Sequence, residues 1–210
     1  MLHGLLFHSR TSSVTAAANL QLENILDPIQ NREAARILDV NTGEVKGANG
    51  GKILRALALG SCISCTSWDP IRRMGAMAHI MLPGAAPMGH QQQNYYAYEA
   101  IIAMLELMKP EKNNLVIHLA GAGNVLQRAD DTICEENIDS VTTILQAKGL
   151  EVSGTSLGGY QRRTVWLDTA TGVVSVSVGD GRKMAMDCGT ADSWPLKVGW
   201  REEANLKVEG

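Results

Sequence analysis

The chain has 210 residues, of which 45% are hydrophobic and 20% charged, and its formal net charge is −3. This composition is that of a globular protein with a hydrophobic core. The small negative charge argues against bulk electrostatic binding to nucleic acid or to an anionic membrane. The uncharged segments are short or broken by Pro and Gly, so we expect no membrane insertion. The four cysteines are scattered and no signal-peptide pattern precedes them, which predicts a cytoplasmic protein with reduced thiols.

The first part of the chain predicts an extension followed by short strands. Residues 1–35 carry a weak helical pattern that Asp27-Pro28 interrupts, and we expect a loosely attached extension. Apolar and β-branched runs bounded by turn residues then indicate four strands. These strands are expected at residues 36–45, with a possible turn at 41–43, and at 52–59, 63–68 and 74–82.

The second part alternates between helices and strands. Helical spacing of apolar residues predicts one helix in 92–108, ended by Pro110, and another in 135–147, ended by Gly149. Further strands are expected at 115–120, 150–155, 163–167, 173–178 and 183–187. Strands outnumber helices and come in hairpins, which favours a mixed or antiparallel sheet with helices on one side over a doubly wound parallel sheet.

Cys62 and His79 form a candidate catalytic pair. They lie on the two strands of a predicted hairpin whose turn we place at Asp69–Arg72, with Pro70 fixing the φ of a type I turn. In that register Trp68 lies opposite Arg73 and Cys62 lies opposite His79 on one face of the sheet. If the turn is longer or shorter by two residues, Cys62 and His79 stay on one face but lie diagonally. If its length differs by one residue, they lie on opposite faces. A thiol beside an imidazole is suited to acyl transfer, whereas spacing alone favours a buried cysteine and a core histidine.

The block GSCISCTSWDPIRRMGAMAHIMLP, which starts at Gly60, closely resembles the signature of the CheD family, the chemoreceptor glutamine deamidases of bacterial chemotaxis. Other pieces follow in the family's order over about residues 36–187. They are Gly43-Glu44, the segment 119–123, Asn137, and the Gly158-Gly159 turn with a following arginine. The fold expected for this resemblance is α+β, a three-layer α/β/β sandwich with mixed, mostly antiparallel sheets and two main helices on one side. The chain then divides into an extension (1–35), a CheD-like domain (36–188) and a tail (189–210).

The resemblance implies a role for each matching residue. Cys62 is the expected nucleophile and His79 its general base and acid, in hydrolysis of receptor glutamine side chains and of glutamyl methyl esters. Backbone N–H groups around Ser61-Cys62 are expected to stabilise the oxyanion, with Gly60 and Ser61 as backbone support. Residues that we expect to orient the site or contact the substrate are Ser64, Thr66, Asn137, Gly158 and Gly159. No cofactor and no metal are expected.

The chain departs from the family at one position. Members often carry a threonine six residues before the cysteine that helps to orient the histidine, and Ala56 stands there in this chain. Another hydroxyl or a backbone carbonyl would have to replace it. The expected partners are chemoreceptor cytoplasmic domains and a CheC-type phosphatase, and the alternative to an enzyme is a non-catalytic chemotaxis adaptor that binds them.

Three other kinds of site fit parts of the sequence less well. Cys62 and Cys65 form a C-x-x-C, but redox pairs favour a helix N-terminus, and a strand is expected here. A zinc site requires four ligands, and Cys62, Cys65 and His79 supply three. Gly121 and Gly123 follow a strand as in dinucleotide sites, but Leu126 replaces the third glycine of that motif.

Overall fold

The computed structural model describes residues 35–109, 114–129 and 132–186. Residues 38–210 belong to one compact unit and residues 1–37 to another. The expected extension and tail lie almost entirely outside the described residues, so the three-part division stays a prediction. No described helix combines the length and the apolar character needed to cross a membrane.

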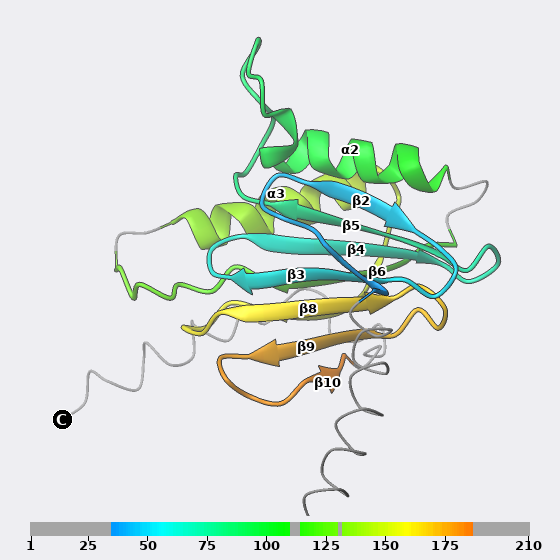
Figure 1. The fold of residues 1–210 in the computed structure, drawn as a ribbon. Helices are drawn as coiled ribbons and strands as arrows, with labels where there is room; N and C mark the ends of the chain where they lie inside the picture. The colour runs from blue at the N-terminus through cyan, green and yellow to red at the C-terminus, as the bar shows by residue number, and fades with distance from the viewer. Residues whose placement is uncertain (1–34, 110–113, 130–131, 187–210) are drawn as a thin grey trace, which may run out of the picture. The chain divides into compact units, whose positions relative to one another are not determined.

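Within the described residues, ten strands form two five-stranded sheets (Figure 1). The first sheet has the order β1-β3-β8-β9-β10 and the second β2-β5-β4-β6-β7. The strands of the first sheet are β1 (Ile37–Asp39), β3 (Ile53–Leu59), β8 (Arg163–Asp168), β9 (Val174–Val178) and β10 (Met184–Ala185). Those of the second are β2 (Val45–Ala48), β5 (Met74–Ile80), β4 (Ile63–Asp69), β6 (Val116–Gly121) and β7 (Val152–Leu157). Only the pairing of β6 with β7 is parallel among the strand pairs recorded for the described residues.

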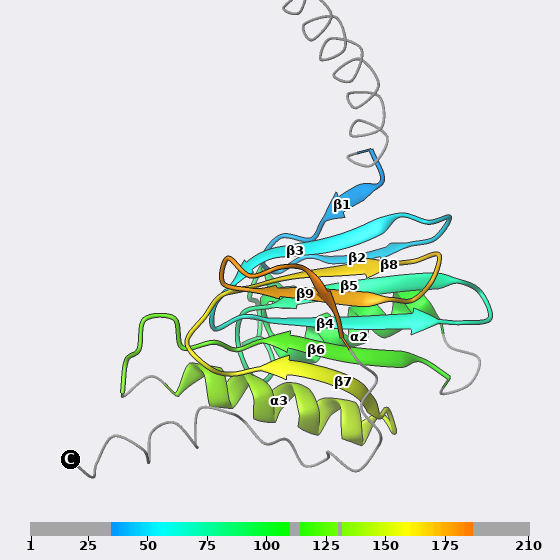
Figure 2. The same cartoon turned by 90° about the horizontal axis from the view of Figure 1, so that it is seen from below.

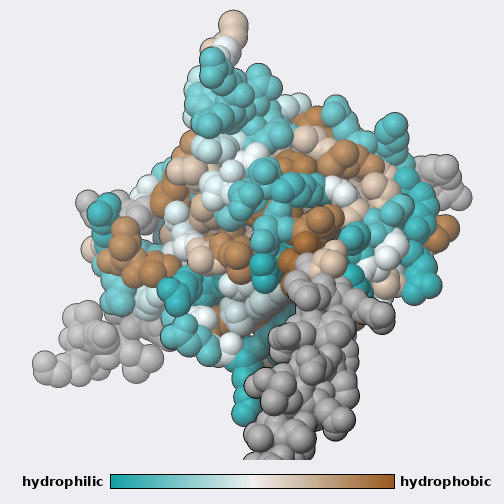
Figure 3. Space-filling model, in the orientation of Figure 1, coloured by the Kyte–Doolittle hydropathy of each residue, from teal (hydrophilic) through white to brown (hydrophobic). Residues whose placement is uncertain are grey.

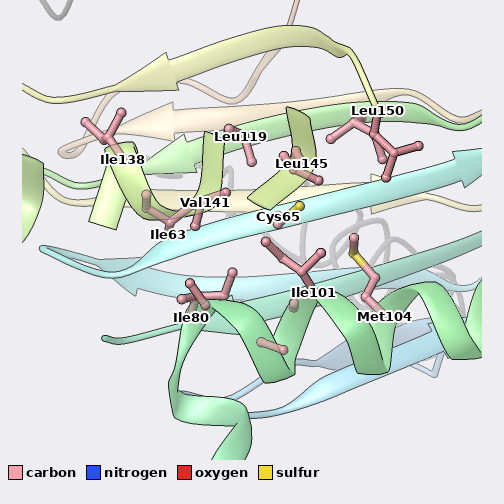
Figure 4. Packing of buried hydrophobic residues seen from close by; sticks show 14 of the residues in the cluster. Ile63, Cys65, Ile80, Ile101, Met104, Leu119, Ile138, Val141, Leu145 and Leu150 are labelled. Atoms are coloured by element: carbon pink, nitrogen blue, oxygen red, sulfur yellow. The ribbon is translucent and has the colours of Figure 1, made fainter. Parts of the chain in front are cut away.

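Two helices cover one face of the second sheet. Helix α2 (Ala97–Met108) follows a 3₁₀ turn, η1 (Gln93–Tyr95), and buries Ala97, Ala100, Ile101, Met104 and Met108 at helical spacing. Helix α3 (Ile133–Ala147) buries Ile138, Val141 and Leu145 in the same way. In Figure 2, α2 is seen behind the strands, and Figure 4 shows side chains of both helices meeting the sheet.

The two faces of β4 therefore belong to different cores. Ile63 and Cys65 point to the helices and join Ile101, Met104 and Leu145 (Figure 4). Leu54, Met77 and Leu167 form a second core with Val165 and Val174 between the two sheets. The helices, the second sheet and the first sheet thus form three successive layers, which confirms the expected α/β/β sandwich.

The β4–β5 hairpin is present, but the expected register was wrong by two residues. Trp68 lies opposite Gly75 instead of Arg73, and Ser64 lies opposite His79. Cys62 precedes β4 by one residue, so its position is diagonal to His79. Because the shift is an even number of residues, Cys62 and His79 remain on the same face of the sheet.

Asp69 explains this register. It remains in β4, paired with Met74, and its Oδ1 accepts the backbone N–H groups of Ile71 and Arg72. A side-chain oxygen that accepts these N–H groups stabilises a turn that begins after the aspartate, so Asp69 itself is not part of the turn. Arg73 then closes the connection with φ 49°, in the left-handed region. The loop consequently spans residues 70–73, one residue further along the chain than expected.

Candidate active site

Cys62 lies where the chain crosses from one sheet to the other. Gly60-Ser61-Cys62 joins β3 in the first sheet to β4 in the second. The crossing is fixed to the end of β6, because Gly60 O accepts the N–H of Gly123 and Cys62 O accepts the N–H of Ala122, each at 2.8 Å. The Cys62 side chain is half-buried and packs on the core between the sheets.

His79 enters the same inter-sheet space from β5 and is only 5% exposed. Its backbone pairs with the segment that precedes β2: His79 N–H donates to Glu44 O at 3.0 Å, and Gly43 N–H donates to His79 O at 2.8 Å. Gly43 has φ 75°, and the ring of Tyr95 occupies the space in which a Cβ would stand. These contacts hold residues 40–44, which we call the 40–44 loop, against the histidine.

The 40–44 loop contacts both ring nitrogens of His79. Nδ1 lies 3.0 Å from the carbonyl oxygen of Val40, which only accepts, so the proton sits on Nδ1 in the neutral ring. Nε2 then carries the lone pair and lies 3.4 Å from Oγ1 of Thr42. The distance is long for a hydrogen bond, so the hydroxyl holds this nitrogen only loosely. The arrangement leaves Nε2 as the nitrogen that can act as a base.

Burial favours the neutral form of both groups. It raises the pKa of the Cys62 thiol, which the residue's own backbone N–H partly offsets. It also lowers the pKa of His79, against the opposing effects of the Val40 hydrogen bond and the Glu44 charge. Both directions favour a resting thiol and a neutral imidazole over the thiolate–imidazolium pair that is often found beside reactive cysteines.

This charge state predicts how Cys62 reacts with iodoacetamide. We expect its alkylation rate to keep rising with pH through a pKa above the ordinary thiol value of about 8.5. Cys65 is fully buried with its pKa raised to about 12, so it should stay unmodified in the folded protein and serve as an internal reference. Peptide mass spectrometry across a pH series measures both rates. A Cys62 rate that is already constant at neutral pH would show an ion pair instead.

A cavity of about 280 Å³ opens beside the imidazole. Its walls come from the 40–44 loop, from β3 and from His79, and Arg55 on β3 forms an ion pair with Asp39 at 2.7 Å. The residues that line it are Asp39, Val40, Asn41, Thr42, Arg55, Leu57 and His79. Polar groups around a small cavity next to a base fit a polar ligand group.

Comparisons with known proteins identify the family. The family model described as CheD chemotactic sensory transduction matches residues 81–178. A chain from Chlorobium luteolum named probable chemoreceptor glutamine deamidase CheD is 35% identical over 143 residues, which are 66% of this chain and 71% of the relative. The chain belongs to the CheD family. A relative of the same name from Archaeoglobus fulgidus is 30% identical over 69% of this chain and 95% of its own, and the chemoreceptor glutamine deamidase CheD of Thermotoga maritima is 26% identical over 69% and 94%.

Within this CheD protein, Ala56 is a core residue. It is fully buried between the sheets and lies opposite Val165. The Val40 carbonyl, and not a side chain at position 56, fixes the tautomer of His79. Sequence reasoning missed Val40 and Thr42, although it noted that a backbone carbonyl can orient the ring. The only signal in the sequence was that both residues lie within the three positions before Gly43-Glu44.

Two expected hydroxyls lie on β4. Ser64 is directly opposite His79 and fully buried, and its Oγ has no hydrogen-bond partner among the described residues. Thr66 lies opposite Met77, two pairs further from the site, and donates to the carbonyl oxygen of His118 at 3.3 Å. Of these two side chains, Ser64 is therefore the one placed at the imidazole.

The remaining expected site residues support the loops around Cys62. The Nδ2 group of Asn137, on α3, donates to the carbonyl oxygens of Ser61 and Met81. Gly158 N–H donates to Gly121 O, and Gly159 O accepts the N–H of Asn124. In the described structure these three residues contact backbone next to the site, at the end of the sheet where β4 begins.

Cys65 does not converge with Cys62 and His79. It points from the opposite face of β4 into the core under the helices, as its sulfur in Figure 4 shows. A Cys62–Cys65 disulfide or a shared metal would require β4 to rearrange. The geometry therefore disfavours the redox and zinc alternatives at these residues.

Proposed function

We propose that this CheD protein hydrolyses glutamine side chains of chemoreceptors to glutamate, with Cys62 as nucleophile and His79 as general base and acid. The observation that carries the proposal is that a half-buried cysteine and a buried histidine with one available lone pair share a face of adjacent strands. The relatives' name, chemoreceptor glutamine deamidase, gives the substrate.

The first half of the reaction forms a thioester. Cys62 Sγ attacks the carbonyl carbon of the glutamine side chain while Nε2 of His79 takes the thiol proton. The carbonyl electrons move to oxygen, and the resulting imidazolium is stabilised by the Val40 carbonyl at Nδ1. When the tetrahedral species collapses, Nε2 returns the proton to the amide nitrogen and ammonia leaves.

Water completes the reaction. It attacks the thioester as Nε2 of His79 takes one of its protons, and the C–S bond then breaks. Nε2 returns that proton to sulfur, so the cysteine is regenerated and the product is a glutamate side chain. Neutral resting groups suit this cycle because each proton taken by Nε2 is given back within the same half-reaction.

The surface near Cys62 fits a protein substrate. Partly exposed apolar side chains surround this end of the sheet: Leu57 on β3, Met81 after β5, and Val125 and Leu126 after β6. Figure 3 shows apolar atoms at the left edge, over the loop after β6, with hydrophilic residues around them. Mixed apolar and polar surface of this kind is common where one protein binds another. We propose receptor cytoplasmic domains as the bound partner, and docking of a CheC-type phosphatase stays a prediction.

The test is direct. The purified protein should convert glutamines in receptor cytoplasmic fragments to glutamates and release ammonia, which mass spectrometry and an ammonia assay follow together. The same fragments carrying glutamyl methyl esters test the second hydrolysis that the family resemblance implies. Tight binding to receptor fragments with neither product would favour the adaptor instead.

Thr42 provides a prediction within this mechanism. Thr42→Val removes the hydroxyl near Nε2, and we expect kcat to fall by only about 2–3-fold, because the contact is long at 3.4 Å and should lie at the low end of the about 0.5–1.5 kcal/mol of a hydrogen bond. Thr42→Ser keeps the hydroxyl and should retain parent activity. Steady-state kinetics on one receptor fragment compares the three proteins. A loss in Thr42→Ser with none in Thr42→Val would mean that the methyl packing of Thr42, and not its hydroxyl, matters.

A further inference from the structure

Asn137 connects the helix layer to both ends of the catalytic hairpin. It lies on α3, is fully buried, and uses its Nδ2 group for two hydrogen bonds. One goes to the carbonyl oxygen of Ser61 at 3.0 Å and the other to that of Met81 at 3.1 Å. Ser61 immediately precedes Cys62, and Met81 follows His79 by two residues. One amide group thus holds the backbone on the two strands that carry the nucleophile and the base.

The Ser61 bond also fixes the direction of the next N–H group. In a trans peptide the C=O and the following N–H point in opposite directions. Asn137 draws Ser61 O toward the helix layer, so Cys62 N–H points away from it, toward the space between the sheets. The Cys62 side chain lies on that same side, packed on the inter-sheet core.

Two observations indicate that this N–H is available beside the sulfur. It donates to no backbone carbonyl among the bonds recorded for the described loops and turns. It also lies close enough to the sulfur of its own residue to lower the thiol pKa against the effect of burial. A donor next to the attacking sulfur can reach the oxygen that becomes negative in the tetrahedral species.

We infer that Asn137 is a positioning residue that aims the backbone N–H of Cys62 at the oxyanion. This inference rests on the proposed function and adds to it the residue that orients the oxyanion donor. Asn137 does not contact the substrate, because both Nδ2 hydrogens are used on backbone carbonyls and the side chain is fully buried. Its role is confined to steps that form a tetrahedral oxyanion.

That restriction gives a readout that a purely structural role would not produce. Alkylation of Cys62 by iodoacetamide is a substitution at carbon and forms no oxyanion, whereas glutamine hydrolysis does. In Asn137→Ser, which keeps one donor in a smaller side chain, we expect kcat for deamidation to fall about 10²-fold, within the range for loss of an oxyanion donor. The alkylation rate of Cys62 at the same pH should be unchanged.

A control on the same helix separates this effect from general loosening. Ser140 Oγ accepts the N–H of Gly84 at 2.7 Å, so Ser140→Ala also removes a bond between α3 and a loop. Both its deamidation and its alkylation should match the parent. Thermal unfolding of each variant establishes the folded fraction. Asn137→Gln keeps the amide but moves its NH₂ group by one methylene, so it is a second variant in which this donor is displaced.

The outcomes are distinct. Slower deamidation with unchanged alkylation supports the inference. Parallel loss of both rates, or loss of neither, overturns it while leaving the proposed function intact. A parent protein that deamidates no receptor fragment overturns the proposed function itself, whatever the variants do.

Discussion

Cys62→Ala should abolish conversion of receptor glutamine to glutamate. The proposed route passes through a bond to the Cys62 sulfur, and alanine offers no nucleophile in its place. Removing the nucleophile of a comparable acyl-transfer site costs on the order of 10⁴–10⁶-fold in kcat. Because the side chain is half-buried at the edge of a core, the variant should fold and still bind receptor fragments. Mass spectrometry of the fragments measures the conversion, and a binding assay measures the retained affinity.

Cys65→Ala is the matched control. It removes a thiol three residues away that faces the helices and is fully buried. We expect a loss of about 1 kcal/mol in the free energy of unfolding and parent activity below the unfolding temperature. If Cys62→Ala deamidates as fast as Cys65→Ala, the nucleophile has been misassigned.

His79→Gln should lower kcat by about 10²–10⁴-fold at neutral pH, the usual contribution of a general acid–base residue. The pH dependence should also change. In the parent, activity requires a neutral imidazole, and burial lowers the pKa of His79. The acid limb of the parent profile should therefore lie below the ordinary histidine value of about 6.5, with activity rising as the pH increases through it.

Without the base, the variant depends on thiolate formed by the solvent. Burial raises the pKa of Cys62, so the rate of His79→Gln should climb with pH throughout the neutral range, where the parent is constant. His118→Gln, at another buried histidine, on β6, should keep the parent profile. A His79→Gln profile that parallels the parent's would contradict a role for His79 in proton transfer.

The layers of this fold were predictable because local patterns specify them. Helical spacing around Ile101 and Val141 indicated the two helices, and two strand-like runs on either side of Asp69-Pro70 indicated the hairpin. The register of the hairpin was not predictable, because it depends on whether Asp69 belongs to the strand β4 or to the turn. Asp69 remains in β4 through its side-chain bonds to the backbone of Ile71 and Arg72, and its strand propensity alone does not reveal this.

The pair of candidate catalytic residues could be named from the sequence, but their surroundings could not. Cys62 and His79 lie 17 positions apart on one predicted hairpin, so local pairing places them together. Val40 and Thr42 reach His79 only because the 40–44 loop pairs with the backbone of β5. Contacts between segments so far apart in the chain follow from the whole sheet, and no short motif encodes them.

The most direct measurement is the activity of the parent protein as Cys62 is progressively alkylated, with peptide mass spectrometry giving the modified fraction at each point. If Cys62 is the nucleophile, deamidation of a receptor cytoplasmic fragment falls in proportion to the Cys62 that is modified, while Cys65 stays unmodified, and reaches zero when Cys62 is fully blocked. Undiminished conversion by fully alkylated protein, or no conversion by the unmodified protein, would show that Cys62 is not the nucleophile of this reaction.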